Sequence, residues 1–469
     1  MSEQLADPEE LSQKILKFSK TYHLVDFRRD RALYMQLTPD QLKQYPVCIC
    51  GVVMNLIMDG ELDKAEEYIN NHSEEGLLLI QKLGLKLVFP RITWREFLNI
   101  IAYLKKNKIS LGTVILTVGR PSILNGFNDF TRMGPLLVKQ KSIFIENLTY
   151  LYETSVCPSI YQVCLAEYYY QLNKVFDAEL LVSRTIKEFD KNAERHLLFA
   201  ALSLQTKILI AHGKIVNSDS YIKNIRNFVE ENKTVEFAYN IDAAEVMMAF
   251  YDGNCITICD WMKHNAPDEF ADFNMLDLYR YMVKIRCYIV EKKYAAVVAI
   301  AEKLRPLLEE GRRHMDMCEL DILLAISLFR AQKKDLAFEV LERGLQIAKR
   351  RGYYRLVGDE GVALLPLLID YIKEKGESDF LMKILEIVRS MAIYHPLYLN
   401  DKLKNNESFS QREIEILKLV EQGKTKEEIA DYFFISTNTV KFHLKNIYMK
   451  LEANSATQAV WQGRVLGII

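Results

Sequence analysis

The sequence predicts an all-α fold in which a solenoid of helical hairpins precedes a small C-terminal helix-turn-helix unit. Apolar and amphipathic helical segments alternate through the middle of the chain, and turn signals recur there at Asn173, Gly213, Gly253, Lys292 and Lys333, at spacings of 40, 40, 39 and 41 residues. Near the C-terminus, capping signals separate short amphipathic segments. Because one hairpin cannot bury its own apolar faces, a periodic series of hairpins must stack into a curved solenoid with a concave surface.

Composition places the chain among ordinary globular proteins. It has 469 residues, of which 49% are hydrophobic and 26% charged, and its formal net charge is -1. This length implies at least two domains, and the charge excludes a protein that coats nucleic acid over its whole surface. The acidic N-terminus and the lack of long apolar runs predict no signal peptide and no membrane contact. Eight cysteines without Cys-x-x-Cys spacing indicate reduced thiols and a cytoplasmic location.

The first seventy residues carry clear helix signals. Pro8 opens a predicted helix over Leu11 to Phe18, and Thr38, Pro39 and Asp40 open another. The apolar segment 47–58 and the amphipathic segment 61–69 are separated by Asp59-Gly60, which predicts a helical hairpin.

Residues 118–134 (VGRPSILNGFNDFTRMG) predict a long irregular connection, because glycine, proline, asparagine and aspartate are concentrated there. Long loops in compact domains are often functional. The alternative is a linker between hairpins in which Arg120 and Asp129 are local structural partners. The sequence leaves both interpretations open.

The periodic region predicts paired helices such as 161–171 with 176–188, 278–290 with 294–308, and 318–331 with 336–349. Alanines early in the second helices allow close helix approach, as in tetratricopeptide-like units, although a period of about forty exceeds the usual one. The region resembles the superhelical sensor repeat of MalT-like activators. Residues 353–398, which include Leu356 to Gly361, also look like the end of the helical region in these regulators. The predicted domains are a sensor or interaction domain over 1–400, a linker over 401–408 and a C-terminal domain over 409–469.

The C-terminal domain begins with a predicted capping box, Ser410 to Glu413, and its first helix ends at Gly423. A second box, Thr425 to Glu428, begins the second helix. The third helix is predicted from Ser436 to about Leu451. Helical spacing puts one set of its side chains on a packing face, Val440, Leu444, Ile447 and Leu451, and another on the opposite face, Asn438, Lys441, Phe442 and Lys445. Since 436–450 contains lysines and no acid, the opposite face suits the major groove of DNA.

The residues of this domain resemble the LuxR-type (GerE-like) helix-turn-helix family; the pattern comprises Arg412-Glu413, Gly423, Glu428-Ile429-Ala430, Ile435-Ser436, Thr439-Val440-Lys441, His443, Lys450-Leu451 and Ala459-Val460. The resemblance implies base contacts by Lys441, Phe442 and Lys445. Asn438 lies on the same exposed face, and we expect it to contact bases as well. It also implies phosphate contacts by Lys424, Lys426, Thr437 and Thr439, and we expect His443 to act in packing and phosphate contact. The sequence departs from the family pattern in two places, at Ala456 and at the pair Thr425-Lys426.

The final helix is predicted over about 455–466, with Ala459, Gly463 and Leu466 inward and Trp461 and Val465 outward. In LuxR-type domains this helix commonly mediates dimerisation. Trp461 and Val465 are therefore candidate dimerisation residues.

No catalytic motif, cofactor motif or metal-ligand pattern is recognised, so the chain is not expected to be an enzyme, to carry a cofactor or to bind a metal. Gly423-Lys424-Thr425 resembles the end of a phosphate-binding loop, but the required upstream glycine and strand are missing. Larger MalT-like relatives carry an upstream ATPase domain, and its motifs are not found here. Arg280, between Tyr279 and Tyr281, is a candidate effector contact, although such aromatic stripes more often pack between helices.

These expectations describe a bacterial-type transcription regulator whose helical-repeat domain senses a small-molecule or protein effector and controls binding to double-stranded promoter DNA as a homodimer or higher oligomer. The alternative is a tetratricopeptide-type scaffold for protein interaction, in which the C-terminal domain docks and does not read DNA.

Overall fold

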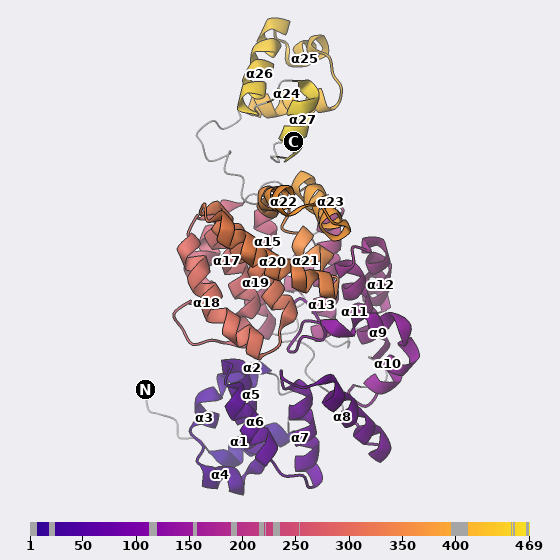
Figure 1. The fold of residues 1–469 in the computed structure, drawn as a ribbon, viewed down its shortest axis with the longest axis vertical. Coiled ribbons are helices and arrows are strands. Elements are labelled where there is room, and N and C mark those ends of the chain that lie inside the picture. Colours follow the sequence, from indigo (N-terminus) through magenta and orange to yellow (C-terminus); the bar gives the residue numbers. More distant parts are fainter. Residues whose placement is uncertain are drawn as a thin grey trace.

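The computed structural model describes residues 7–17, 24–111, 120–152, 157–188, 195–214, 220, 222–227, 235–252, 254–394, 411–451, 453, 455–465 and 469. These residues form helices joined by turns and contain no β-strand, only an isolated antiparallel bridge between Asn125 and Asp129. The predicted all-α class is confirmed. Figure 1 shows a large helical array with a small helical unit, the C-terminal part of the chain, at one end.

The N-terminal segment forms four short helices, more than the sequence predicts: α1 (Pro8–Lys17), α2 (Leu24–Arg29), α3 (Arg31–Met35) and α4 (Pro39–Gln44). Thr38 begins α4 with a complete capping box, since its side chain accepts from the Gln41 N–H while the Gln41 side chain accepts from the Thr38 N–H. The predicted hairpin follows as α5 (Ile49–Asp59) and α6 (Leu62–Asn71), after the short 3-10 turn η1 (Pro46–Cys48). Gly60 joins α5 to α6 with a φ of +81°, a conformation that glycine adopts without strain.

Two further helices, α7 (Gly76–Val88) and α8 (Trp94–Asn107), lead to the irregular segment, which is described from Arg120. The chain continues through η2 (Thr131–Met133), α9 (Gly134–Lys139) and α10 (Lys141–Leu148).

The periodic region forms the predicted hairpins. The described helices are α11 (Cys157–Gln171), α12 (Val175–Glu188), α13 (Arg195–Ala211), α15 (Val235–Asp252), α16 (Cys255–His264), η3 (Met275–Asp277), α17 (Leu278–Val290), α18 (Tyr294–Glu310), α19 (His314–Arg330) and α20 (Lys334–Arg351). Left-handed turns occur at Asn173, Gly213 and Lys292, as predicted, whereas the turn predicted at Lys333 lies one residue earlier, at Gln332. The turn predicted at Gly253 lies outside the described residues.

Three helices close the array: α21 (Tyr354–Gly358), α22 (Gly361–Lys375) and α23 (Asp379–Tyr394). A β-carbon placed on Gly358 would lie 2.3 Å from Ile387 Cγ2, so glycine allows α21 to approach α23 closely. Among the described residues, no helix is both long enough and apolar enough to cross a lipid bilayer.

The array winds far enough to contact its own beginning. Helix α5 packs on η3, and a β-carbon on Gly60 would lie 2.7 Å from Leu307 Cδ2. Arg91, which follows α7, pairs with Glu310 at the end of α18. One cluster of buried apolar residues therefore extends from Leu11 to Val388. The result is a closed superhelix, in which the first hairpin and later hairpins share a core.

Segment 120–134 fills part of the space inside this closed superhelix. Arg120 pairs with Asp316, and the buried Arg313 donates hydrogen bonds to the backbone oxygens of Phe127 (2.6 Å) and Gly126 (3.1 Å). The Asp129 carboxylate accepts the backbone N–H of Met315 at 2.9 Å. Arg120 and Asp129 thus have structural roles, but the residues that they bind are not local. Asp316 and Met315 lie on α19, more than 180 residues away along the chain.

Candidate nucleic-acid interface

The C-terminal unit consists of α24 (Gln411–Glu421), α25 (Lys426–Phe433), α26 (Thr437–Lys450) and α27 (Ala456–Val465). Val440, Leu444, Ile447 and Leu451 are buried in one cluster with Ile416 and Leu417 of α24. The predicted packing face of α26 is therefore confirmed. The predicted capping residue of α24, Ser410, and the linker 401–408 lie outside the described residues.

Helix α25 is fixed by the predicted capping box. Glu428 N–H donates to Thr425 Oγ1 (3.2 Å), and the Glu428 carboxylate accepts the Thr425 N–H (2.8 Å). The Lys424 ammonium lies 3.2 Å from Glu428 Oε1. The Thr425 N–H and the Lys424 ammonium together lower the pKa of Glu428. The carboxylate therefore stays ionised at the helix N-terminus, where negative charge is favourable.

The turn into α26 contains Phe434 and Ser436. Phe434 has a φ of +53° and its side chain is 96% exposed. Ser436 caps α26, since its hydroxyl accepts the Thr439 N–H (3.1 Å) and lies 2.8 Å from the Thr439 hydroxyl. This cap fixes where α26 begins, and the packing of α25 against α26 sets the direction in which α26 projects its side chains.

All four residues predicted to contact bases are exposed: Asn438, Lys441, Phe442 and Lys445. They lie on the face of α26 opposite Val440 and Leu444, and the phenyl ring of Phe442 is 62% exposed. Their base contacts stay predictions. Because α26 contains no acidic residue, the charge that this face presents is positive.

The residues predicted to contact phosphate differ in their surroundings. Lys424 and Lys426 are exposed, whereas Thr437, Thr439 and His443 are half-buried. Two of them already have partners within the domain, since Lys424 pairs with Glu428 and Thr439 bonds with Ser436. A phosphate at these positions would have to share or replace those bonds.

The last helix is anchored by Gly463, which was predicted to face inward, and by Arg464, which was not predicted to take part. Arg464 donates to Glu421 of α24 at 2.6 Å, and a β-carbon on Gly463 would lie 2.7 Å from Leu417 Cδ2. Glycine at position 463 thus permits close packing of α27 on α24. These contacts hold α27 although Ala456, at its start, departs from the family pattern. The spacing between Glu421 and Arg464 is 43 residues, so no local pattern could have indicated this pair.

The candidate dimerisation surface is described only in part. Trp461 is 53% exposed on α27, and the side chain of Val465 lies outside the described residues. The same helix contacts α23 of the helical array. Figure 1 shows α27 as the helix of the small unit that faces α22 and α23.

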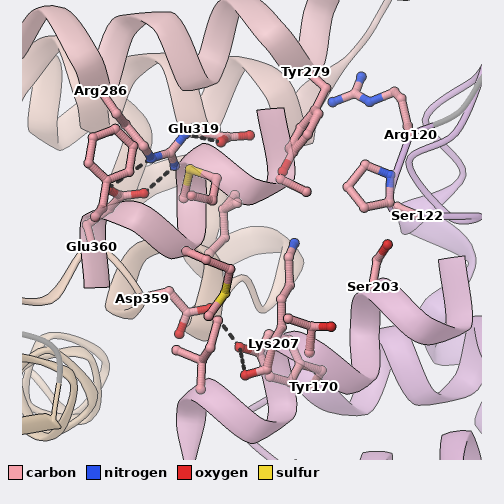
Figure 2. A pocket seen from close by; sticks show the side chains of 18 of the residues that line it. Arg120, Ser122, Tyr170, Ser203, Lys207, Tyr279, Arg286, Glu319, Asp359 and Glu360 are labelled. Atoms are coloured by element: carbon pink, nitrogen blue, oxygen red, sulfur yellow. Dashed lines mark hydrogen bonds and ion pairs between the residues drawn. The ribbon is translucent and has the colours of Figure 1, made fainter. Parts of the chain in front are cut away.

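The candidate effector residue, Arg280, pairs with Asp277 and donates to the backbone oxygen of Asn265. It is absent from the lining of a cavity of about 150 Å³ inside the helical array, which we call the central cavity. Figure 2 shows this cavity, which lies between segment 120–125 and the helices α11, α13, α15, α17, α19, α21 and α23. Its polar residues, among them Lys207, come from separate repeats, and the spacing of residues along the sequence does not indicate that they meet.

Comparison with family models gives two matches. Residues 152–374 match the MalT-like TPR region, and residues 407–461 match the bacterial regulatory proteins of the luxR family. The first match covers the hairpins from α11 to α22, and the second covers α24, α25, α26 and part of α27. The chain therefore joins a MalT-like tetratricopeptide region to a helix-turn-helix domain of the luxR family, and this domain supports a role in DNA-binding regulation.

Proposed function

We propose that this protein binds promoter DNA through α26 and that the helical-repeat region controls this binding in response to an effector. The observation that carries the first part is the exposed face of α26, with Lys441 and Lys445 one helical turn apart and no acid on the helix. A helix of this kind, packed on its opposite side, fits the major groove. In a homodimer or larger oligomer, each α26 takes one half-site.

The contact between α23 and α27 supports the second part of the proposal. Met391 of α23 lines the central cavity, so one helix is in contact with both the cavity and the DNA-binding domain. An effector that prefers one arrangement of α23 would shift the equilibrium between an occluded form and a form whose α27 is free to pair with a second copy. Such a shift requires different effector affinities for the two forms.

The double variant Lys441→Ala/Lys445→Ala tests the DNA-binding proposal. We expect loss of specific binding to the promoter of the protein's own gene, because each lost base contact weakens binding by about 1–3 kcal/mol. Gel shift and footprinting measure this loss, and circular dichroism checks that the variant is folded. Lys418→Ala, which removes an exposed lysine of α24, is the matched control and should bind like the unchanged protein.

Retained footprinting by the folded double variant would refute the assignment of α26. The scaffold alternative has a different signature, since a docking domain would show only weak DNA binding that modest salt abolishes in all variants alike.

A further inference from the structure

Most charged groups in the wall of the central cavity have partners inside the protein. Arg286 pairs with Glu319 (2.9 Å) and with Glu360. Asp359 accepts the Tyr170 hydroxyl at 2.9 Å and lies 2.6 Å from the Arg355 guanidinium. Each of these three carboxylates therefore already has a guanidinium partner, although Glu319 and Glu360 share one, and a bound cation would find none of them unpaired.

Lys207 differs from these groups. It projects from α13, and Figure 2 shows its ammonium group pointing into the cavity between Tyr279 and Asp359. The side chain is exposed, and within the described part of the chain its ammonium has neither a hydrogen bond nor an ion pair. A charged donor without a partner, inside a cavity whose acids are paired, is suited to an anion.

Two hydroxyl groups of the wall are also available. Ser203 and Tyr279 line the cavity, and neither hydroxyl has a hydrogen-bond partner within the described residues. Burial raises the pKa of Tyr279 above its ordinary value, so the phenol keeps its proton at neutral pH and can donate. Lys207, Ser203 and Tyr279 thus give the cavity three such donors, one of them charged, beside the side-chain amide of Gln171 in its wall. This is few for a sugar, whose many hydroxyl groups each need a partner when buried.

The remaining wall is largely apolar and adaptable. Met247 and Met248 of α15, Phe250, Ile210 and Met391 contribute to it. Unbranched methionine side chains fill irregular space and pack well against aromatic rings. An apolar cavity of about 150 Å³ accommodates a molecule the size of benzene. The volume therefore matches one ring or a short branched hydrocarbon.

We propose that the central cavity binds a small amphipathic carboxylic acid, whose carboxylate pairs with Lys207 and whose single ring or short hydrocarbon body packs among Met247, Met248 and Met391. This inference rests on the proposed function, because it names the chemical class of the effector. Ser203 and Tyr279 donate to the second carboxylate oxygen. The bound acid then touches α15 and α23, which places its body directly against the helix that contacts α27.

Phenylacetate and its neutral analogue phenylacetamide test the charge requirement. We expect ligand-observed NMR titration of the full chain to detect phenylacetate binding, and phenylacetamide to bind at least about tenfold more weakly, because a charge-assisted bond is lost. Lys207→Met should weaken phenylacetate binding about tenfold or more, whereas Lys207→Arg keeps the charge and should retain most of it. Lys263→Met, which changes an exposed lysine on α16, is the control and should have no effect.

Three outcomes would overturn the proposal: equal binding of acid and amide, unchanged acid binding by folded Lys207→Met, or no binding of phenylacetate, 3-phenylpropionate or hexanoate to the unchanged chain. Binding of neutral sugars alone would also overturn it. The titration contains no DNA, and the gel shift with the α26 variant contains no acid. Failure of one proposal is therefore distinguished from failure of the other.

Discussion

A single carboxylate, Glu269, organises the segment between α16 and α17. It pairs with Lys284, which is only 5% exposed, and accepts the Tyr288 hydroxyl at 2.6 Å. Lys284 also donates to the Pro267 backbone oxygen at 2.6 Å. Burial alone would raise the pKa of Glu269, but these donors lower it to about 2. The charged form is therefore the one that the folded protein stabilises.

This pairing predicts a pH dependence of stability. Because the folded pKa is below the unfolded value of about 4.3, the stabilisation by Glu269 is fully present above that value and is lost as pH falls toward 2. Glu269→Gln should therefore destabilise the protein at neutral pH, with the difference from the unchanged chain shrinking between about pH 4.5 and pH 2. Urea unfolding across this range measures it. Glu302→Gln, an exposed change on α18, should leave the pH dependence unaltered.

At the scale of elements, the close approach of α21 and α23 depends on one glycine. A methyl group at Gly358 would lie 2.3 Å from Ile387 Cγ2 and 2.7 Å from its Cβ, and a branched side chain fixed at Cβ cannot move aside. We expect Gly358→Ala to lower the free energy of unfolding by about 1–3 kcal/mol. Thermal and urea denaturation measure the change.

Gly84 provides the matched comparison, since it lies within α7 and an added β-carbon would meet nothing within 4 Å. Gly84→Ala should raise stability by about 0.5–1 kcal/mol through the helix preference of alanine. Equal effects of the two substitutions would contradict the steric explanation.

The elements that the sequence predicted are those whose signals are local. The caps at Thr38 and Thr425 and the turns at Gly60, Asn173 and Lys292 depend on residues within a few positions of one another. The exposed face of α26 could be predicted for the same reason, because helical period alone separates it from the packing face. The pairs Arg464–Glu421 and Arg120–Asp316 depend on tertiary packing, and so does the presence of Lys207 and Met391 in the wall of one cavity. No pattern of spacing indicates them.

At the scale of the whole molecule, Asp316 connects segment 120–134 to the repeats. It is fully buried between Arg120 and Arg313; burial would raise its pKa, but the two guanidinium groups hold it below the ordinary value. Asp316→Asn would leave two buried cations without their carboxylate. We expect a loss of about 3–5 kcal/mol in the free energy of unfolding, measured by urea denaturation.

The control for this substitution is Asp272→Asn, at an exposed position, which should change stability by less than about 0.5 kcal/mol. An open array of repeats would lose only local order when Asp316 is changed. A closed one should still unfold in a single transition, shifted to lower urea concentration.

The distance along the chain between Arg120 and Asp316 has a consequence for biosynthesis. These partners are separated by 196 residues, and ribosomes add about 5–20 residues per second. Asp316 is therefore synthesised about 10–40 s after Arg120. During this interval the apolar faces of the first hairpins stay open to other nascent chains. We therefore expect folding to finish only after translation has passed α19, and newly made protein to depend on chaperones until then.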